Sequence, residues 1–253
     1  MGRMTNMKQL VISWCNYTWD NSRVFVKSLR KTGYTGDIVF IGGTSDPLTI
    51  SKYNWYSVGM IACGNTNESI TRTYLSFLLN NIDIYDRVLL SDARDVVFQS
   101  NPFDNMDNKL HVVCEDLKIK DQYLNKFWVE QDYGTDIFEK INNDTIICAG
   151  TTYGGIIPVI EMVIEILVRI NKNYQATLNY LCRSGNVNAV IEPNDGNSLV
   201  WTIGTKIDTE QDDFYKFREH LVTTLDNVAP PIIHQYDRHS RIKEMLENYY
   251  ADH

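Results

Sequence analysis

Asp86-Arg87-Val88-Leu89-Leu90-Ser91-Asp92-Ala93-Arg94-Asp95-Val96-Val97-Phe98-Gln99-Ser100-Asn101-Pro102-Phe103 has the pattern of an apolar strand that stops at two carboxylates and then resumes. The continuous apolar run over 88–90 is typical of a strand buried on both faces, and the β-branched pair at 96–97 argues against a helix. Asp92 and Asp95 therefore lie at a strand end. In open α/β sheets ligands bind beyond the carboxyl ends of the strands, so we expect both side chains to project into such a crevice.

Two carboxylates at a strand end are hard oxygen ligands, which favour Mg²⁺ or Mn²⁺. Residues three apart on an extended strand point to opposite faces. Asp92 and Asp95 could thus share an ion only if the chain turns at 93–94, or if one carboxylate acts through a bound water. The alternative is structural: Asp92 forms a turn and Asp95 pairs with Arg94 or another base. The spacing alone leaves both open.

Residues 92–103, Asp-Ala-Arg-Asp-Val-Val-Phe-Gln-x-x-Pro-Phe, resemble the metal-binding segment of nucleotide-sugar-dependent glycosyltransferases of the GT-A fold. That segment usually reads Asp-x-Asp. When the two are aligned on Asp-Val-Val-Phe, Asp95 matches the second aspartate and Ala93 stands at the position of the first. The resemblance implies that Asp92 takes over the first aspartate's task and that Ala93 lies among the residues that contact the donor.

The composition is that of an ordinary globular protein. The 253 residues are 43% hydrophobic and 22% charged, which is enough for one large α/β domain over 1–253. The formal net charge of −8 argues against a nucleic-acid or membrane-surface binder, which would need a basic face. We find no run of eighteen apolar residues and no signal-peptide core, so we expect no integral membrane segment. Five widely spaced cysteines fit buried thiols in a reducing compartment, which predicts a cytoplasmic location.

Apolar runs and turn signals predict alternating strands and helices. Strands are expected over 10–15, 37–43, 55–61, 88–90 (resuming at 96–97), 110–115, 145–155, 187–191, 198–203 and 230–234, and helices over 22–31, 68–80, 158–170, 173–180 and 240–249. The first strand, helix and second strand form a right-handed βαβ unit. Residues 116–142 are expected to be mostly helical, and 205–221 to be loop plus helix. The prediction is a single Rossmann-like α/β domain with a mixed, mostly parallel sheet flanked by helices, and the resemblance makes it GT-A.

The resemblance also assigns residues to the donor nucleotide sugar. In GT-A enzymes the loop after the first strand holds the base and ribose, which implies polar and stacking contacts from Asn16 and Tyr17. A basic residue on the helix before the metal strand reaches the donor in related enzymes, and Arg72 with Tyr74 matches that position loosely. Strand 145–155 resembles the one that lines the donor sugar, with Gly150 allowing close backbone approach. The alternatives are a surface loop with aromatic plugs and a solvated arginine.

Residues 173–180, Asn-Tyr-Gln-Ala-Thr-Leu-Asn-Tyr, resemble the Asp-Gln-x-x-Leu-Asn segment of retaining GT-A enzymes. Tyr174 replaces the usual aspartate. Gln175 keeps the amide that lies beneath the reacting sugar carbon in those relatives, so Gln175 is the predicted catalytic residue. The structural alternative is an amphipathic helix that packs its apolar residues inward. Aromatic residues over 123–138 suit the acceptor side of this fold, although most are expected in the core.

A late apolar strand over 230–234 ends at His234 and is followed by a basic helix over 240–249. Many metal-dependent GT-A enzymes take a third metal ligand from such a histidine, and His234 matches that place better than His239. Neutral imidazole is an acceptable Mn²⁺ ligand and a poor Mg²⁺ ligand, so manganese is the expected ion, with magnesium as the second choice. Arg238, Arg241 or Lys243 could then face the diphosphate, and Arg238 is the predicted contact. The alternative is a capping histidine beside a solvated helix.

The sequence thus predicts a metal-dependent glycosyltransferase that moves a sugar from a nucleotide diphosphate sugar to a hydroxyl of a glycan or similar acceptor. The metal would neutralise charge on the leaving nucleotide. One rival is a nucleotidyltransferase acting on a sugar phosphate, which usually needs a glycine- and lysine-rich phosphate loop that residues 10–23 lack. A second rival is a catalytically inactive nucleotide-sugar-binding module, which would keep its ligand affinity without metal.

Overall fold

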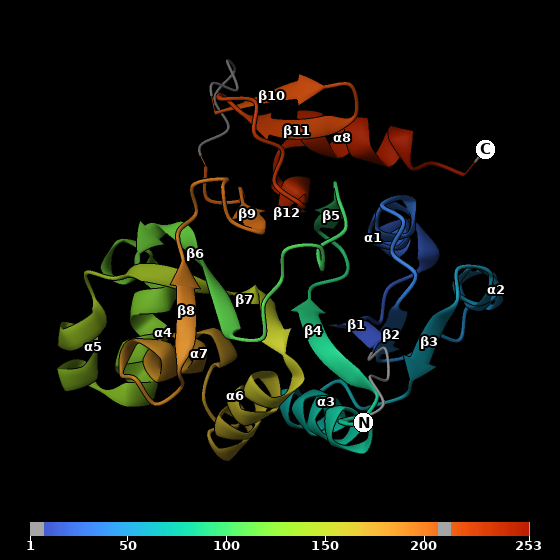
Figure 1. The fold of residues 1–253 in the computed structure, drawn as a ribbon. Coiled ribbons are helices and arrows are strands. Elements are labelled where there is room, and N and C mark those ends of the chain that lie inside the picture. Colours follow the sequence, from blue (N-terminus) through green and yellow to red (C-terminus); the bar gives the residue numbers. More distant parts are fainter. Residues whose placement is uncertain (1–7, 207–213, 253) are drawn as a thin grey trace, which may run out of the picture.

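The structure is a computed structural model that describes residues 8–206 and 214–252 (Figure 1). Seven strands form its central sheet: β1 (Lys8–Trp14), β2 (Asp37–Ile41), β3 (Val58–Ile61), β4 (Tyr85–Ser91), β6 (Leu110–Lys118), β7 (Thr145–Gly155) and β8 (Ala189–Glu192). Their order across the sheet is β3-β2-β1-β4-β7-β6-β8. β7 is antiparallel to both of its neighbours, whereas every other pair is parallel. The prediction of an α/β fold with a mixed, mostly parallel sheet is confirmed.

Helices cover both faces of this sheet, and the last helix packs elsewhere, against the C-terminal strands. The helices are α1 (Trp19–Lys31), α2 (Pro47–Trp55), α3 (Asn67–Asn80), α4 (Tyr123–Tyr133), α5 (Thr135–Ile141), α6 (Ile156–Val168), α7 (Tyr174–Arg183) and α8 (Ser240–Tyr249), with short 3-10 turns η1 (Ile119–Asp121) and η2 (Tyr236–Arg238). Because side chains alternate along a strand, Leu10 and Ile12 of β1 pack with α3, α6 and α7, whereas Val11 packs with α1 and α2. β1 is therefore buried on both faces, which explains its continuous apolar sequence.

A second sheet of three short strands lies beyond the carboxyl end of β4 (Figure 1). It consists of β5 (Val96–Phe98), β9 (Val200–Thr202) and β12 (Ile232–His234). β12 is the middle strand, antiparallel to β5 and parallel to β9. The apolar segment that resumes after Asp95 therefore belongs to this second sheet and not to the central one. Through this sheet, β9 and β12 lie close to the edge of the central sheet where β4 ends.

Two elements near the start of the chain differ from the prediction. α2 is a helix that the sequence reading omits, although its signals are present: Asp46 accepts a hydrogen bond from the Thr49 N–H at 2.8 Å, and Pro47 occupies the first turn. The strand expected over 55–61 begins only at Val58. Helices α1, α3, α6, α7 and α8 match their predicted positions to within three residues at each end.

The expectation of loop plus helix over 205–221 is wrong where the structure describes it. Residues Tyr215–Arg218 form β10, which pairs with β11 (Leu221–Thr224) as an antiparallel hairpin. Tyr215 and Val222 are buried in a cluster with Ile242 and Leu246 of α8. The alternating aromatic residues of β10 thus make the apolar contacts that the expected helix would have made. Residues 207–213 of this segment lie outside the described residues.

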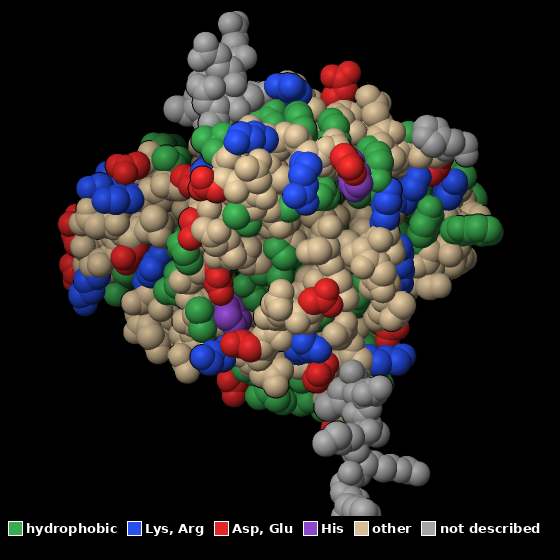
Figure 2. Space-filling view, turned by 45° about the horizontal axis from the view of Figure 1, so that its top comes forward, with side chains coloured by type: hydrophobic (Ala, Val, Ile, Leu, Met, Phe, Trp, Pro, Cys, Tyr) green, Lys and Arg blue, Asp and Glu red, His purple; other side chains and the backbone are tan. Residues whose placement is uncertain are grey.

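Acidic and basic side chains are interspersed over the face of the molecule that Figure 2 displays. Within residues 8–206 and 214–252, none of the helices combines the length and the apolar character needed to cross a bilayer.

Candidate metal centre and adjoining cavity

Asp92, Asp95 and His234 converge beyond the carboxyl end of β4. One ligand atom from each of them lies within 4.8 Å of the others. His234 Nε2 is 3.6 Å from Asp92 Oδ2 and 3.8 Å from Asp95 Oδ1. Two carboxylate oxygens and one imidazole nitrogen form a donor set that suits Mn²⁺. We refer to these residues as the metal trio.

A bend and a strand pairing bring the trio together. The chain leaves β4 at Asp92 and bends over 93–95 before β5 begins, so the two carboxylates are not held on opposite faces of one strand. The ladder between β12 and β5 pairs His234 with Val96, next to Asp95. The backbone N–H of Gln235 donates to the Asp95 carbonyl at 2.7 Å and fixes this register.

Gly150 on β7 lies against the trio. Its carbonyl accepts a hydrogen bond from the Asp92 N–H at 2.8 Å. A Cβ at this position would lie 2.4 Å from His234 Cε1 and 2.6 Å from Asp92 Oδ2, closer than real side chains approach. The close approach that the sequence assigns to Gly150 is therefore present, and it is toward the trio.

Ala93 does not lie in the site. Its side chain is 1% exposed and belongs to the apolar cluster that contains Phe25, Val96 and Phe98. A methyl group packed in a core cannot contact a charged donor, so the assignment of Ala93 to donor binding is corrected. The preceding residue, Asp92, instead directs a 58% exposed side chain toward His234.

The surroundings of His234 favour a cation. The residue is fully buried, and its Nδ1 lies 3.4 Å from Thr202 Oγ1 and 3.6 Å from Cys148 Sγ. Its Nε2 has no hydrogen-bond partner among the described residues. Buried polar atoms are nearly always satisfied, so an unpaired nitrogen facing two carboxylates fits a metal ligand. Burial by itself lowers the pKa of His234, but Cys148 and the nearby aspartates outweigh this and raise that pKa well above its usual value.

Asp95 is the buried carboxylate of the trio, with an 11% exposed side chain. Burial raises the pKa of Asp95, and the nearby His234 opposes this rise only in part. Burial disfavours the charged form of Asp95, and a divalent cation beside the carboxylate would stabilise that form. The residues present therefore fit Mn²⁺.

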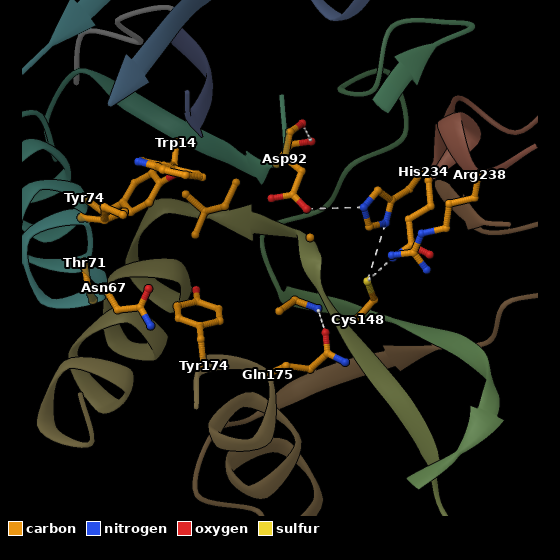
Figure 3. A pocket seen from close by; sticks show the side chains of 16 residues that line it. Trp14, Asn67, Thr71, Tyr74, Asp92, Cys148, Tyr174, Gln175, His234 and Arg238 are labelled. Atoms are coloured by element: carbon orange, nitrogen blue, oxygen red, sulfur yellow. Dashed lines mark hydrogen bonds and ion pairs between the residues drawn. The ribbon is translucent and has the colours of Figure 1, made fainter. Parts of the chain in front are cut away.

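A cavity of about 350 Å³ opens beside the trio (Figure 3). Its walls come from the end of β1, the first two turns of α3, the middle of β7, the start of α7 and the turn after β12. Gln175 lines it, and its Oε1 accepts a 3.4 Å hydrogen bond from the Ala149 N–H while its Nε2 donates to Asn125 Oδ1 at 2.9 Å. Arg238 lines the same cavity on the side of His234.

Arg72 does not line this cavity. The α3 residues that do are Asn67, Ile70, Thr71 and Tyr74, which share one face of the helix. Arg72 is one position beyond Thr71 and thus about 100° further round the helix. It lies in a separate cavity, where it donates to Glu68 at 2.8 Å with a 63% exposed side chain. The assignment of Arg72 to donor binding is corrected in favour of its solvated alternative.

The loop after β1 lies close to the trio without lining the cavity. Asn16 is exposed, and Tyr17 is half-buried with its ring edge-on to Trp14 at 6.0 Å. Burial raises the pKa of Tyr17, and the charges of Asp92 and Asp95 contribute to the rise, which places the hydroxyl near the trio. Asn16 and Tyr17 stay candidates for the nucleotide.

Several cavity residues are not assigned by the sequence reading. Trp14 ends β1 at the same sheet edge as Asp92, so the rule that identified Asp92 could have identified it. Tyr74, which the resemblance names beside Arg72, does line the cavity, whereas Arg72 does not. Cys148 is buried beneath His234 and contacts its imidazole ring. Because this contact is tertiary, no pattern in the sequence predicts it.

Of the aromatic residues over 123–138, two are exposed. Tyr123 and Phe127 stack on the surface of α4 with their ring centroids 6.4 Å apart. Trp128, Tyr133 and Phe138 pack in or against a buried cluster. The expectation that most of these rings belong to the core is confirmed.

Comparison with protein-family models finds no match to this chain, and comparison with curated proteins finds none either.

Proposed function

We propose that this protein is a metal-dependent glycosyltransferase of GT-A type, which transfers a sugar from a nucleotide diphosphate sugar to an acceptor hydroxyl. The observation that carries the proposal is the metal trio at the mouth of a cavity large enough for a sugar. His234 Nε2 is buried and unpaired among the described residues, and it faces both carboxylates. Mn²⁺ held by these three residues would neutralise the diphosphate of the leaving nucleotide.

The chain's own residues account for binding and orientation. Arg238 lies on the His234 side of the cavity, where its guanidinium can pair with phosphate oxygens. The thiol of Cys148 and the hydroxyl of Thr202 hold His234 in place through its Nδ1 side. The trio is therefore held in advance at one end of the cavity.

Gln175 is proposed to act on the sugar. In the transfer, the acceptor oxygen bonds to the anomeric carbon and its proton passes to the departing phosphate oxygen, while the bond from that carbon to the diphosphate breaks and positive charge develops at the sugar. The Gln175 amide is fixed by Ala149 on one side and Asn125 on the other. A carbonyl oxygen has two lone pairs, so the oxygen that accepts from Ala149 keeps one for the sugar. An amide held in this way stabilises developing positive charge without reorganising.

The test is a thermal-shift and transfer panel of nucleotide sugars with and without Mn²⁺. A nucleotide sugar at a hundred times its dissociation constant should stabilise the protein by about 2.7 kcal/mol when Mn²⁺ is present. Asp95→Asn should abolish both the Mn²⁺-dependent shift and transfer while leaving the fold intact, because it removes a charged ligand without changing shape. Asp83→Asn, at an exposed position before β4, is the matched control.

Two results would contradict the proposal. One is a panel in which no nucleotide sugar shifts the melting temperature with Mn²⁺ present. The other is wild-type transfer by Asp95→Asn at limiting Mn²⁺. Ligand binding that is unaffected by metal removal would favour the inactive binding module instead.

A further inference from the structure

The cavity has two chemically different ends (Figure 3). His234, Cys148 and Arg238 form one end. The other is an aromatic wall of Trp14, Tyr74 and Tyr174, with the polar side chains of Asn67 and Thr71 beside it. The metal chemistry proposed above uses only the first end and leaves the aromatic wall without a role.

We propose that the aromatic wall holds the sugar ring of the donor, that this sugar is electrically neutral, and that Tyr174 is the residue that recognises it. The inference rests on the proposed function, because it assumes a diphosphate bound at the trio. It goes further by naming the class of sugar and the residue that selects it.

The position of the wall fits a group attached to the diphosphate. Asp92 lies between the two ends of the cavity in Figure 3. Asp92, Tyr74 and Tyr174 line the same cavity. A sugar bonded to a diphosphate at the trio would therefore extend past Asp92 toward these rings.

The hydroxyl of Tyr174 is available to a ligand. Tyr174 has no hydrogen bond to another described residue, and its hydroxyl end points into the cavity in Figure 3. Its ring can pack against the C–H face of a sugar while its hydroxyl bonds to a sugar hydroxyl.

The charges around the wall favour a neutral sugar. Among the described residues that line the cavity, the basic side chain is Arg238, which lies at the opposite end. A sugar carboxylate would sit against aromatic rings and near Asp92 without a cationic partner, which is costly.

The first turns of α3 and α7 also face the cavity, and helix N-termini attract anions. Each is already capped by its own chain. Thr66 accepts from the Ser69 N–H at 3.2 Å, and Asn173 accepts from the Ala176 N–H at 3.0 Å. The caps satisfy N–H groups that a carboxylate would otherwise bind.

The experiment measures how much affinity the sugar adds to the nucleotide. With saturating Mn²⁺, calorimetry compares UDP with UDP-glucose and UDP-glucuronate, and GDP with GDP-mannose and GDP-mannuronate. On the base that binds, the neutral sugar should tighten binding by about tenfold, which corresponds to about 1.4 kcal/mol. The uronate differs only at C6 and should bind no more tightly than the nucleotide alone.

Variants at Tyr174 test whether this side chain recognises the sugar. Tyr174→Ala should remove the gain from the sugar, and Tyr174→Phe should reduce it, while both keep wild-type affinity for the nucleotide diphosphate. A loss of folding would lower the two affinities together, so their ratio isolates recognition. Tyr180→Phe is the matched control, because Tyr180 is on the same helix but stacks on Tyr133 outside the cavity.

Failure of the inference can be told apart from failure of the proposed function. If the nucleotide binds with Mn²⁺ but the uronate binds as tightly as the neutral sugar, or Tyr174→Ala keeps the full gain, the inference is wrong and the function stands. If neither the nucleotide nor its sugars bind with Mn²⁺, both are wrong.

Discussion

At the scale of single residues, Gly150 tests whether the trio must keep its geometry. In Gly150→Ala the new Cβ would lie 2.4–2.6 Å from atoms of His234 and Asp92, so one of them must move. We expect Mn²⁺ affinity to fall at least tenfold, measured by electron paramagnetic resonance titration. Gly43→Ala is the control, because nothing lies within 4 Å of a Cβ there. Equal Mn²⁺ affinity in both variants would show that Gly150 does not limit the trio.

The pH dependence of Mn²⁺ binding follows from two pKa shifts at the same site. The pKa of His234 is raised well above 6.5 by its acidic neighbours, and that of Asp95 is raised by burial. Mn²⁺ needs both groups deprotonated, so protons compete with it and affinity falls as pH falls. Because the pKa of His234 is raised, affinity should still be rising with pH above 6.5. Calorimetric titrations from pH 5.5 to 8.5 measure this, and a flat profile above 6.5 would contradict it.

At the scale of elements, the amide of Gln99, just after β5, joins the second sheet to the β10–β11 hairpin. Its Oε1 accepts from the Val222 N–H at 2.7 Å, and its Nε2 donates to the carbonyls of Val222 and Pro230, both at 2.9 Å. Gln99→Ala leaves three backbone groups without that partner, so we expect unfolding to become easier by about 2–4 kcal/mol. Chemical denaturation measures the change. Gln131→Ala, on the exposed face of α4, should shift stability by less than about 0.5 kcal/mol.

The sequence predicts those elements whose signals are local patterns, and it misplaces residues whose position depends on tertiary contacts. The apolar run of β4 and the carboxylates after it depend on burial and on strand ends, which are local patterns. The sequence predicts His234 as a ligand because it too ends an apolar strand and matches the late-strand histidine of the resemblance. Arg72 was misplaced because one helical position changes direction by about 100°, which a loose motif match does not resolve. Ala93 was misplaced because the bend after Asp92 turns it into the core.

The aromatic wall of the cavity could not be predicted from the sequence. Trp14, Tyr74 and Tyr174 come from β1, α3 and α7, and their meeting depends on how these elements pack around β4 and β7. No spacing in the sequence encodes that meeting. Cys148 and Thr202 reach His234 in the same way, through the pairing of β12 with β9 and the approach of β7.

At the scale of the whole molecule, Asp252 binds side chains of α1 and α2 that lie 200 to 233 residues earlier in the chain. Its carboxylate accepts from Lys52 at 2.7 Å, from Lys27 at 3.1 Å and from the indole N–H of Trp19 at 2.9 Å. Asp252 thus contacts both α1 and α2, which cover one face of the central sheet. The side chain is 39% exposed, so solvent and salt screen these contacts.

Acid should release this contact in a defined window. The hydrogen bond from Lys52, followed by that from Lys27, lowers the pKa of Asp252 from 3.8 to about 2. A lowered pKa means that the carboxylate stabilises the fold above pH 3.8 and loses this contribution as pH falls toward 2. Asp252→Asn should therefore be less stable than wild type by about 1 kcal/mol or less at pH 7 and low salt, with the difference shrinking between pH 4 and pH 2. Urea denaturation of both proteins across this range measures it. A difference that grew on acidification, or that did not fall when salt was added, would show that Asp252 acts by packing and not by charge.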